Sequence, residues 1–339
     1  MLDMRRRDLT CLIIIEALCT LRSHRAMSAG KLPRIVFVTP IGRSGGATDG
    51  DSWNGLVTAF LQGLRDFGYI DGTTMKFEFY SAEGKPSQVD EIAARILEDP
   101  PDVVVAGGGG ANEVAHAFKR LTRTVPIVMA NSSDPVMQGL VLSLARPGGN
   151  ITGFSGNTGP DFEVKRLEIL REIAPYVSKI AYLGLKIDWE SPVGIAVRSA
   201  AERFDAMVIH AEHASLDYSR AFDFILKEKV QGLFVGRNPW NYSNRHAIAA
   251  FAADRRIAAV YPTREYIEVA GLISYGPSLS VLYRRAARYV DKILKGDKPA
   301  DLPVDQPSKF ELVINTKAAL AIGITPPATL LARADEIID

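Results

Sequence analysis

The stretch VVVAGGGGANEVAHAFKRL, residues 103–121, joins a short apolar run to an amphipathic segment through four glycines. Val103-Val104-Val105 is a continuous β-branched run, which is typical of a strand buried on both faces of a parallel sheet. Apolar residues then recur at Val114, Ala117 and Phe118, the spacing of one face of a helix. The stretch therefore predicts a strand, loop and helix unit of a parallel α/β sheet.

The same unit recurs on both sides of this stretch. The strands expected in a first block are residues 35–39, 77–80, 103–105 and 126–130, and those of a second block are 180–183, 207–210, 233–235, 258–261 and 272–275. The handover between the blocks lies near residues 146–156, which are rich in Gly and Asn. We therefore predict an α/β fold of two doubly wound, Rossmann-like lobes.

The last section is too short for a third domain. It holds a long amphipathic helix over 279–294, a proline-containing link, one strand at 310–314 and two short helices. These elements must pack on the two lobes, so the chain crosses between them three times, as in a hinge. We expect a leader at 1–30, an N-terminal lobe of 31–154 plus 276–306, and a C-terminal lobe of 155–275 plus 307–339.

Bulk composition narrows the range of functions. The 339 residues contain 40 Lys plus Arg and 39 Asp plus Glu, a balance that gives no basic surface for nucleic acid. The two cysteines, Cys11 and Cys19, both precede residue 26, so the body has no disulfide and no cysteine nucleophile. We expect a monomer.

The first 30 residues are typical of an export signal. Arg5-Arg6-Arg7 is a charged start, residues 9–21 are mostly apolar, and small residues follow at 26–29. The arginine pair before Asp8 is consistent with twin-arginine export, and an uncleaved N-terminal extension is the alternative. The prediction is a periplasmic protein.

Ligands of parallel α/β sheets bind beyond the carboxyl ends of the strands. The loop 107–110 lies there, and either its amides hold a carboxylate or it is a tight turn that needs glycine. Arg237, Asn238 and Trp240 follow a second-block strand and offer a bidentate donor, an amide and an aromatic ring.

Two acids near strand ends have competing interpretations. Asp188 follows the strand at 180–183 and either binds a ligand ammonium group or is a surface turn residue. Asp134 precedes Pro135, and a cap for a helix beginning at Val136 is favoured over ligand contact.

Signatures of enzymes are missing. The glycines at 107–110 fit neither G-x-G-x-x-G nor a phosphate-binding P-loop, and the chain has no G-x-S-x-G and no H-E-x-x-H. We therefore expect no catalysis, no cofactor and no metal site. This argues against a Rossmann-type dehydrogenase, the alternative of another class.

Several long segments resemble one family. They are Asp134-Pro135 with VMQGLVLSLARPGGNITG (136–153), YVDKILKGDKPADLPVDQPSKFELVIN (289–315), residues 332–336, residues 261–276, and Gly68-Tyr69 with Asp71-Gly72. Together they resemble the ABC transporter substrate-binding family, typified by TrpX-like tryptophan-binding proteins. The resemblance extends over residues 34–339.

This resemblance implies a type I periplasmic-binding-protein fold that delivers a small molecule to a membrane ABC permease, and studied members bind aromatic amino acids. It also implies that the hinge near Ser155 belongs to the site. A sensory module of the same fold, signalling to a membrane receptor, remains the alternative. The expected ligand-binding residues are Gly108, Gly109, Gly110, Ala111, Asn131, Ser132, Asp134, Ser155, Asp188, Trp189, Arg237, Asn238, Trp240, Tyr261 and Tyr275.

Overall fold

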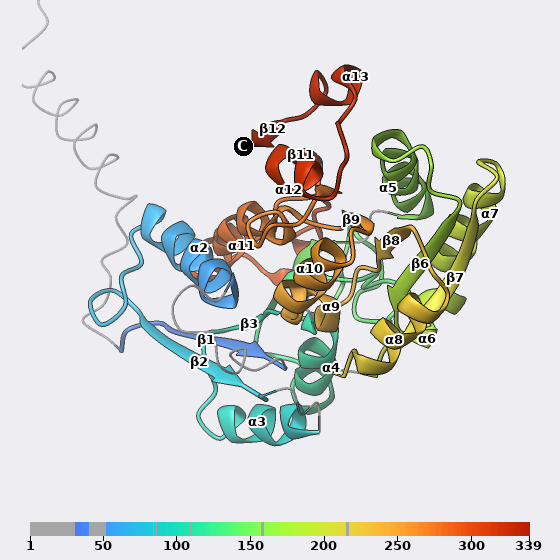
Figure 1. The fold of residues 1–339 in the computed structure, drawn as a ribbon. Coiled ribbons are helices and arrows are strands. Elements are labelled where there is room, and N and C mark those ends of the chain that lie inside the picture. Colours follow the sequence, from blue (N-terminus) through green and yellow to red (C-terminus); the bar gives the residue numbers. More distant parts are fainter. Residues whose placement is uncertain are drawn as a thin grey trace, which may run out of the picture.

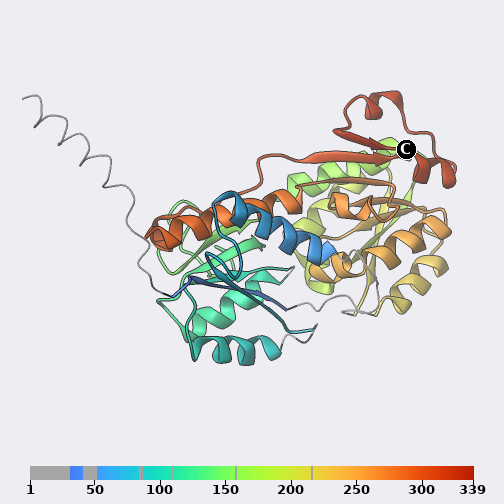
Figure 2. The same ribbon diagram turned by 90° about the vertical axis from the view of Figure 1, so that its left-hand side faces the viewer.

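The computed structural model describes residues 31–40, 52–83, 85, 87–108, 110–156, 159–214 and 217–339. The expected leader (1–30) and Gly109 therefore lie outside the described residues. Two parallel sheets form two lobes, which lie side by side in Figure 2. Within the described residues, no helix combines the length and the apolar character needed to cross a bilayer.

The first sheet has the order β2-β1-β3-β4-β5, and all its strand pairs are parallel. Its strands are β1 (Arg34–Thr39), β2 (Lys76–Ser81), β3 (Val103–Ala106), β4 (Ile127–Ser132) and β5 (Ile151–Ser155). The connecting helices are α2 (Ser52–Asp66), α3 (Gln88–Leu97) and α4 (Ala111–Leu121) (Figure 1). The glycine-rich stretch at 107–110 thus joins β3 to α4, as its sequence predicts.

The side chains of β1 alternate between two hydrophobic clusters, one on each face of the first sheet. Ile35 and Phe37 belong to one buried cluster with Phe60 of α2, whereas Val36 and Val38 belong to another with helices α3 and α4. Successive side chains of a strand point to opposite faces, so a continuous apolar run is buried on both sides.

The second sheet has the order β12-β11-β10-β9-β8-β6-β7, and only the pair β10–β11 is antiparallel. Its strands are β6 (Lys179–Gly184), β7 (Met207–Glu212), β8 (Gly232–Val235), β9 (Ala258–Tyr261), β10 (Ile273–Gly276), β11 (Glu311–Asn315) and β12 (Glu336–Ile338). Its helices are α5 (Gly159–Ile173), α6 (Lys186–Glu190), α7 (Pro192–Glu202), α8 (Ser219–Lys227), α9 (Pro239–Ser243), α10 (Arg245–Asp254), α12 (Thr316–Ala321) and α13 (Ala328–Leu331), with a 3₁₀ turn η1 at Arg264–Tyr266.

Three connections join the lobes, as the sequence predicts. The first follows β5, the second joins β10 to α11 (Leu279–Leu294), and the third leads from η2 (Pro299–Asp301) to β11. The third runs along the first sheet before it leaves, because Ser155 N donates to Asp305 O (2.9 Å) and Asp305 N donates to Gly153 O (3.0 Å).

Two expectations about residues 134–156 were wrong. Residues 151–155, expected within the handover, form the fifth strand β5, because Ile151 and Thr152 are buried and pair with β4. No helix begins at Val136, since residues 135–150 form only turns and bends. Asp134 has a positive φ of 41°, and its carboxylate accepts a hydrogen bond from Met137 N (3.0 Å), so it closes a turn rather than capping a helix.

The late helix α11 packs against α2 in the first lobe (Figure 1). Gly63 permits this close approach, because a Cβ there would lie 2.3 Å from Arg284 O and 2.9 Å from the Cβ of Ala287. Gly55, on the same helix α2, would place a Cβ with nothing within 4 Å.

We predict opposite effects for alanine at these two glycines. Gly63→Ala should lower the free energy of unfolding by about 1–3 kcal/mol, because the new methyl group overpacks the seam. Gly55→Ala should raise it by about 1 kcal/mol, the usual helix preference of alanine over glycine. Urea unfolding of both variants measures the difference, and equal stabilisation by both would contradict the described packing.

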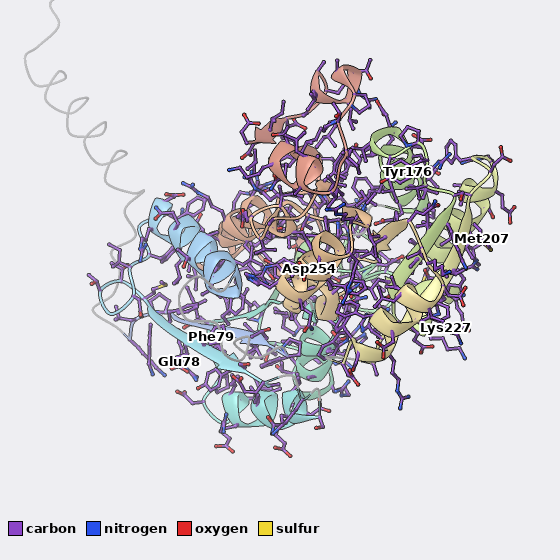
Figure 3. The ribbon with its side chains drawn as sticks, in the orientation of Figure 1. Glu78, Phe79, Tyr176, Met207, Lys227 and Asp254 are labelled. Atoms are coloured by element: carbon purple, nitrogen blue, oxygen red, sulfur yellow. The ribbon has the colours of Figure 1, made fainter. Side chains whose placement is uncertain are left out.

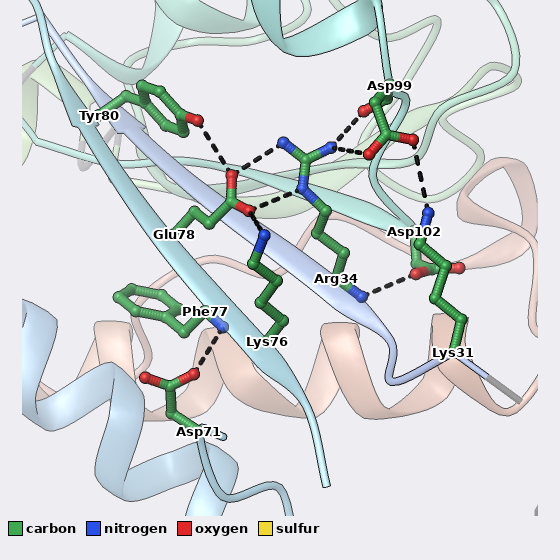
Figure 4. Close-up of polar contacts among 9 residues, drawn as sticks. All are labelled: Lys31, Arg34, Asp71, Lys76, Phe77, Glu78, Tyr80, Asp99 and Asp102. Atoms are coloured by element: carbon green, nitrogen blue, oxygen red, sulfur yellow. Dashed lines mark hydrogen bonds and ion pairs between the residues drawn. The ribbon is translucent and has the colours of Figure 1, made fainter. Parts of the chain in front are cut away.

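An ion-pair network holds the amino edge of the first sheet (Figure 4). Arg34 binds Glu78 through two bonds, Nη2 to Oε2 at 2.8 Å and Nε to Oε1 at 3.0 Å, and Tyr80 donates its hydroxyl to Oε2 at 3.0 Å. The carboxyl of Asp102 accepts from Arg34 N at 2.7 Å. Hydrogen bonding to Arg34 lowers the pKa of Glu78 from 4.5 to about 2.

This lowered pKa predicts an acid-dependent loss of stability. Because the folded pKa lies below the unfolded one, the contribution is complete above pH 4.5 and is lost as pH falls towards 2. We expect Glu78→Gln to be less stable than wild type by about 2–3 kcal/mol at pH 7, a gap that closes near pH 2. Chemical unfolding at several pH values measures it. Glu91→Gln, an exposed change on α3, is the control, and a gap that does not change with pH would refute the assignment.

Candidate ligand-binding site

The two edges of the second sheet differ in character. At the amino edge, the exposed side chains of Tyr176 and Met207 lie before β6 and at the start of β7 (Figure 3). At the carboxyl edge, the chain buries Glu163, Arg166 and Glu265. Charged groups are buried only where the fold or a ligand compensates them, so the carboxyl edge is the candidate site.

The glycine loop of the first lobe is packed tightly. A Cβ on Gly107 would lie 1.9 Å from the Phe37 ring, and one on Gly110 would lie 2.1 Å from Pro40. Gly108, at φ +71°, donates its amide to the Tyr283 hydroxyl of α11 at 2.8 Å. The expected free amide of Gly108 is therefore occupied, and Ala111 begins α4 without a side-chain cap.

The predicted residues at the ends of β4 and β5 surround the first hinge connection. Ser132 donates its hydroxyl to Asn112 Oδ1 at 2.6 Å, which ties β4 to the start of α4. Asn131 Oδ1 is buried without a hydrogen bond and lies against Gly156. Ser155 is buried beside the third connection. Asp134 closes its own turn, as described above.

Asp188 and Asn238 bind each other. Asn238 Nδ2 donates to Asp188 Oδ2 at 2.9 Å, and Leu185 N donates to the same oxygen at 3.1 Å. Asn238 Oδ1 in turn accepts from Asn241 N at 2.8 Å and caps α9. Burial raises the pKa of Asp188, and the bond from Asn238 counters that shift. The structure therefore gives both side chains internal partners that join α6 to α9.

The predicted aromatic residues are placed differently from one another. Trp189 stacks on His210 with ring centroids 5.0 Å apart, and the Arg198 guanidinium lies 4.1 Å from its ring. Tyr261 is 1% exposed and stacks on Tyr266 in the core. Trp240 is half-buried at the start of α9.

Tyr275 belongs to an aromatic cluster at the hinge. Its ring stacks on Phe162 at 5.0 Å, and Phe162 contacts Phe310 at 4.7 Å. These residues stand after the first connection, before the second and at the end of the third. The hinge cluster of Phe162, Tyr275 and Phe310 thus lies beside all three connections.

Arg237 reaches from the end of β8 to the first connection. Its Nη1 donates to Gly156 O at 3.1 Å, its Nε lies 3.7 Å from Glu163 Oε1, and its guanidinium carbon lies 5.4 Å from the centre of the Phe162 ring. Its Nε and Nη2 are closed off from solvent and have no hydrogen-bond partner, since 3.7 Å is too long for such a bond. Burial lowers the pKa of Arg237, and the charge of Glu163 partly offsets this. Two donors remain for a ligand carboxylate or similar acceptor.

Glu265, in η1 after β9, is a functional candidate that the sequence analysis missed. Its side chain is buried, and both carboxylate oxygens lack a hydrogen bond. Burial raises its pKa from 4.5 to about 7, and the nearby Thr263 hydroxyl opposes this shift although the two groups do not reach hydrogen-bonding geometry. The signal in the sequence was an acid four residues beyond the strand end at Tyr261. Among the described residues, no three His, Cys, Asp or Glu side chains gather as metal ligands would.

Comparison with known proteins gives one family and several relatives. The sequence model of one protein family, described as ABC transporter substrate binding protein, matches residues 47–338. The tyrosine-binding protein of Clostridioides difficile (strain R20291) is 24% identical over 267 residues, which are 78% of this chain and 75% of that protein.

Solved structures agree with this match. A conserved domain protein from Vibrio cholerae is 25% identical, with a TM-score of 0.77 over 91% of this chain and 100% of that one. An ABC domain in complex with L-Trp from Streptococcus pneumonia is 24% identical, with a TM-score of 0.76 over 91% of this chain and 100% of that one. The leucine-binding protein LivK from Thermotoga maritima shares the fold at a TM-score of 0.54, with 11% identity over 78% of this chain and 83% of that one.

The hydrogen bonds of Asn238 lead us to predict a role for it in the stability of the fold. Asn238→Ala should lower the free energy of unfolding by about 1–3 kcal/mol without any ligand, because it removes the α9 cap and leaves Asp188 short of a donor. Urea unfolding of the ligand-free protein measures this. Lys186→Ala, an exposed change on the neighbouring α6, is the control, and a variant as stable as this control would rule out the structural role.

Proposed function

The chain belongs to the ABC transporter substrate-binding family, and on this premise we propose that its two lobes close on a small carboxylate-bearing solute and present it to a membrane permease. It is the solute-binding component of an ABC importer. Members of the family are transport proteins rather than enzymes and are usually extracytoplasmic. We propose a non-catalytic, monomeric and periplasmic protein, exported through residues 1–30.

The observation that carries this proposal is the pair of donors left over on Arg237. They lie at the carboxyl edge of the second sheet, where α/β proteins bind ligands, and they are closed off from water. A guanidinium in that state favours a carboxylate, which it can hold through two parallel bonds. Asn131 Oδ1, across the first connection, is a further buried group without a partner.

An aromatic amino acid is the solute class that we propose. The relatives support it, since one is named for tyrosine and another was solved with L-Trp. An aromatic ring is already present there, since Phe162 lies under the Arg237 guanidinium. Such a pocket buries an aromatic side chain while a few polar groups fix its orientation.

Closure around the hinge is the proposed mechanism. The lobes would be residues 31–154 with 276–306 and residues 155–275 with 307–339, and their sheets and the packing of α11 on α2 support this division. Arg237 spans from β8 to Gly156, so a solute on Arg237 would contact the first connection. Binding that is tighter in the closed form shifts the population towards closure, and the permease would then recognise that shape.

We predict that solute binding compacts the protein. L-Tyrosine or L-tryptophan at 100 times its dissociation constant should add about 2.7 kcal/mol to the free energy of unfolding, because it binds only the folded state. Small-angle X-ray scattering should show a smaller radius of gyration with the solute than without. A rigid shape that ignores every amino acid and small carboxylate would refute the proposal.

Arg237→Ala should weaken solute binding about 10- to 100-fold, because it removes charged hydrogen bonds worth about 1.5–3 kcal/mol. Isothermal titration calorimetry measures the affinity. Arg255→Ala, an exposed change after α10, should bind as wild type does, and equal affinity of both variants would exclude Arg237 from the site.

A further inference from the structure

Glu265 is a buried acid that the fold leaves without a counter-ion. It is 4% exposed, and in the described part of the chain it enters no ion pair and no side-chain hydrogen bond. Its neighbour Arg264 points the other way, towards β11 and β12, where it lies 2.9 Å from Glu336 and 3.6 Å from Glu311. The nearest base in sequence is therefore already neutralised by other acids.

The place of Glu265 is the junction of the two lobes. It follows β9, which pairs with β8, so its loop and the Arg237 loop leave neighbouring strand ends. Its charge acts on Arg237 and also on Tyr283, whose hydroxyl holds the amide of Gly108 in the first lobe. The charge of Glu265 thus reaches Arg237 in the second lobe and Tyr283 of α11, which packs on the first.

An unpaired buried carboxylate has two ways to avoid the high cost of burial. It can take up a proton, which its pKa of about 7 favours, or it can meet a cation. Arg237 does not form an ion pair with Glu265, because its guanidinium contacts Gly156 O and Glu163 instead. The groups left over are then one acid in η1 and two donors of a base just after β8, in segments that follow neighbouring strands.

We propose that Glu265 binds the ammonium group of the solute while Arg237 binds its carboxylate, so that the site selects zwitterionic α-amino acids. An α-amino acid carries both charges on one carbon and can therefore bridge groups at neighbouring strand ends. This deepens the proposed function and rests on it. Glu265 takes the role of ammonium partner that the sequence suggested for Asp188. The Asp188 carboxylate already accepts hydrogen bonds from Asn238 and Leu185.

The proposal excludes two other solute chemistries. A carboxylic acid without the amino group would leave Glu265 buried and unpaired, and an amine without the carboxylate would leave the donors of Arg237 unpaired. A site built around a polar group rejects an analogue that lacks it far more strongly than an apolar pocket rejects a missing methylene.

Calorimetric titration of the full chain tests this selection. The probes are the twenty proteinogenic amino acids and, for L-tyrosine and L-tryptophan, the matching des-amino acids, 3-(4-hydroxyphenyl)propionate and indole-3-propionate, and the amines tyramine and tryptamine. We expect an amino acid to bind and both kinds of analogue to bind roughly 30- to 1,000-fold more weakly. A des-amino acid that binds as tightly as its amino acid would overturn the role of Glu265.

The variant Glu265→Gln isolates the carboxylate, since its shape is kept. It should lose roughly 30-fold or more in affinity for the amino acid while its affinity for the des-amino analogue is unchanged. Glu268→Gln, an exposed change two residues beyond η1, is the matched control and should bind as wild type does. Equal affinities of the two variants for the amino acid would overturn the proposal.

A second measurement guards against misfolding. Removing an unpaired buried charge should leave the ligand-free Glu265→Gln protein at least as stable as wild type by thermal melting, even as its affinity falls. Lower stability together with unchanged discrimination between amino acid and des-amino acid would mark Glu265 as merely structural. If wild type binds no amino acid, both this inference and the proposed solute class fall, whereas failure at Glu265 alone leaves the importer function standing.

Discussion

The buried ion pair between Arg166 and Glu163 is the interaction on which the candidate site depends. Arg166 is fully buried in α5, and its Nη2 donates to Val235 O at 2.7 Å, while its guanidinium lies 4.4 Å from the Phe234 ring. The pair therefore fixes the start of α5 against the ends of β8 and β9. The other oxygen of Glu163 faces Arg237, so this pair also sets where the Arg237 guanidinium lies. Removing either partner would leave an uncompensated buried charge, so the pair links the hinge, the strand ends and the candidate site.

In the proposed closure, the same region lets two lobes share one site and still move. The three connections meet in the hinge cluster of Phe162, Tyr275 and Phe310, whose contacts are between rings and have no strict direction. Ring contacts tolerate small rotations better than hydrogen bonds do, since they depend less on angle. The directional contacts lie on either side of this cluster, along β5 in the first lobe and around Arg166 in the second.

The sequence predicted the scaffold well and the site less well, for physical reasons. Strand and helix periodicity is local, so the two lobes, the crossing of α11 and the family were predicted and are confirmed. The strand β5 was missed because its glycine and asparagine flanks outweighed Ile151 and Thr152 in the interpretation. Side-chain pairing is not local: the bond between Asp188 and Asn238 joins α6 to the start of α9, fifty residues apart. The missing partner of Glu265 is visible only once Arg264 is seen to face β12. The predicted ligand contacts remain predictions.

The seam between α2 and α11 has a consequence for the order of folding. The strands of the first sheet are complete in the chain by Ser155, but the helix that covers the face of Ile35, Phe37 and Phe60 ends only at Leu294. Strands β6 to β10 of the other lobe are therefore synthesised before the first lobe can close. A chain that ends before Leu279 lacks the helix that covers this apolar face, and exposed apolar surface of this kind favours aggregation of partly folded chains.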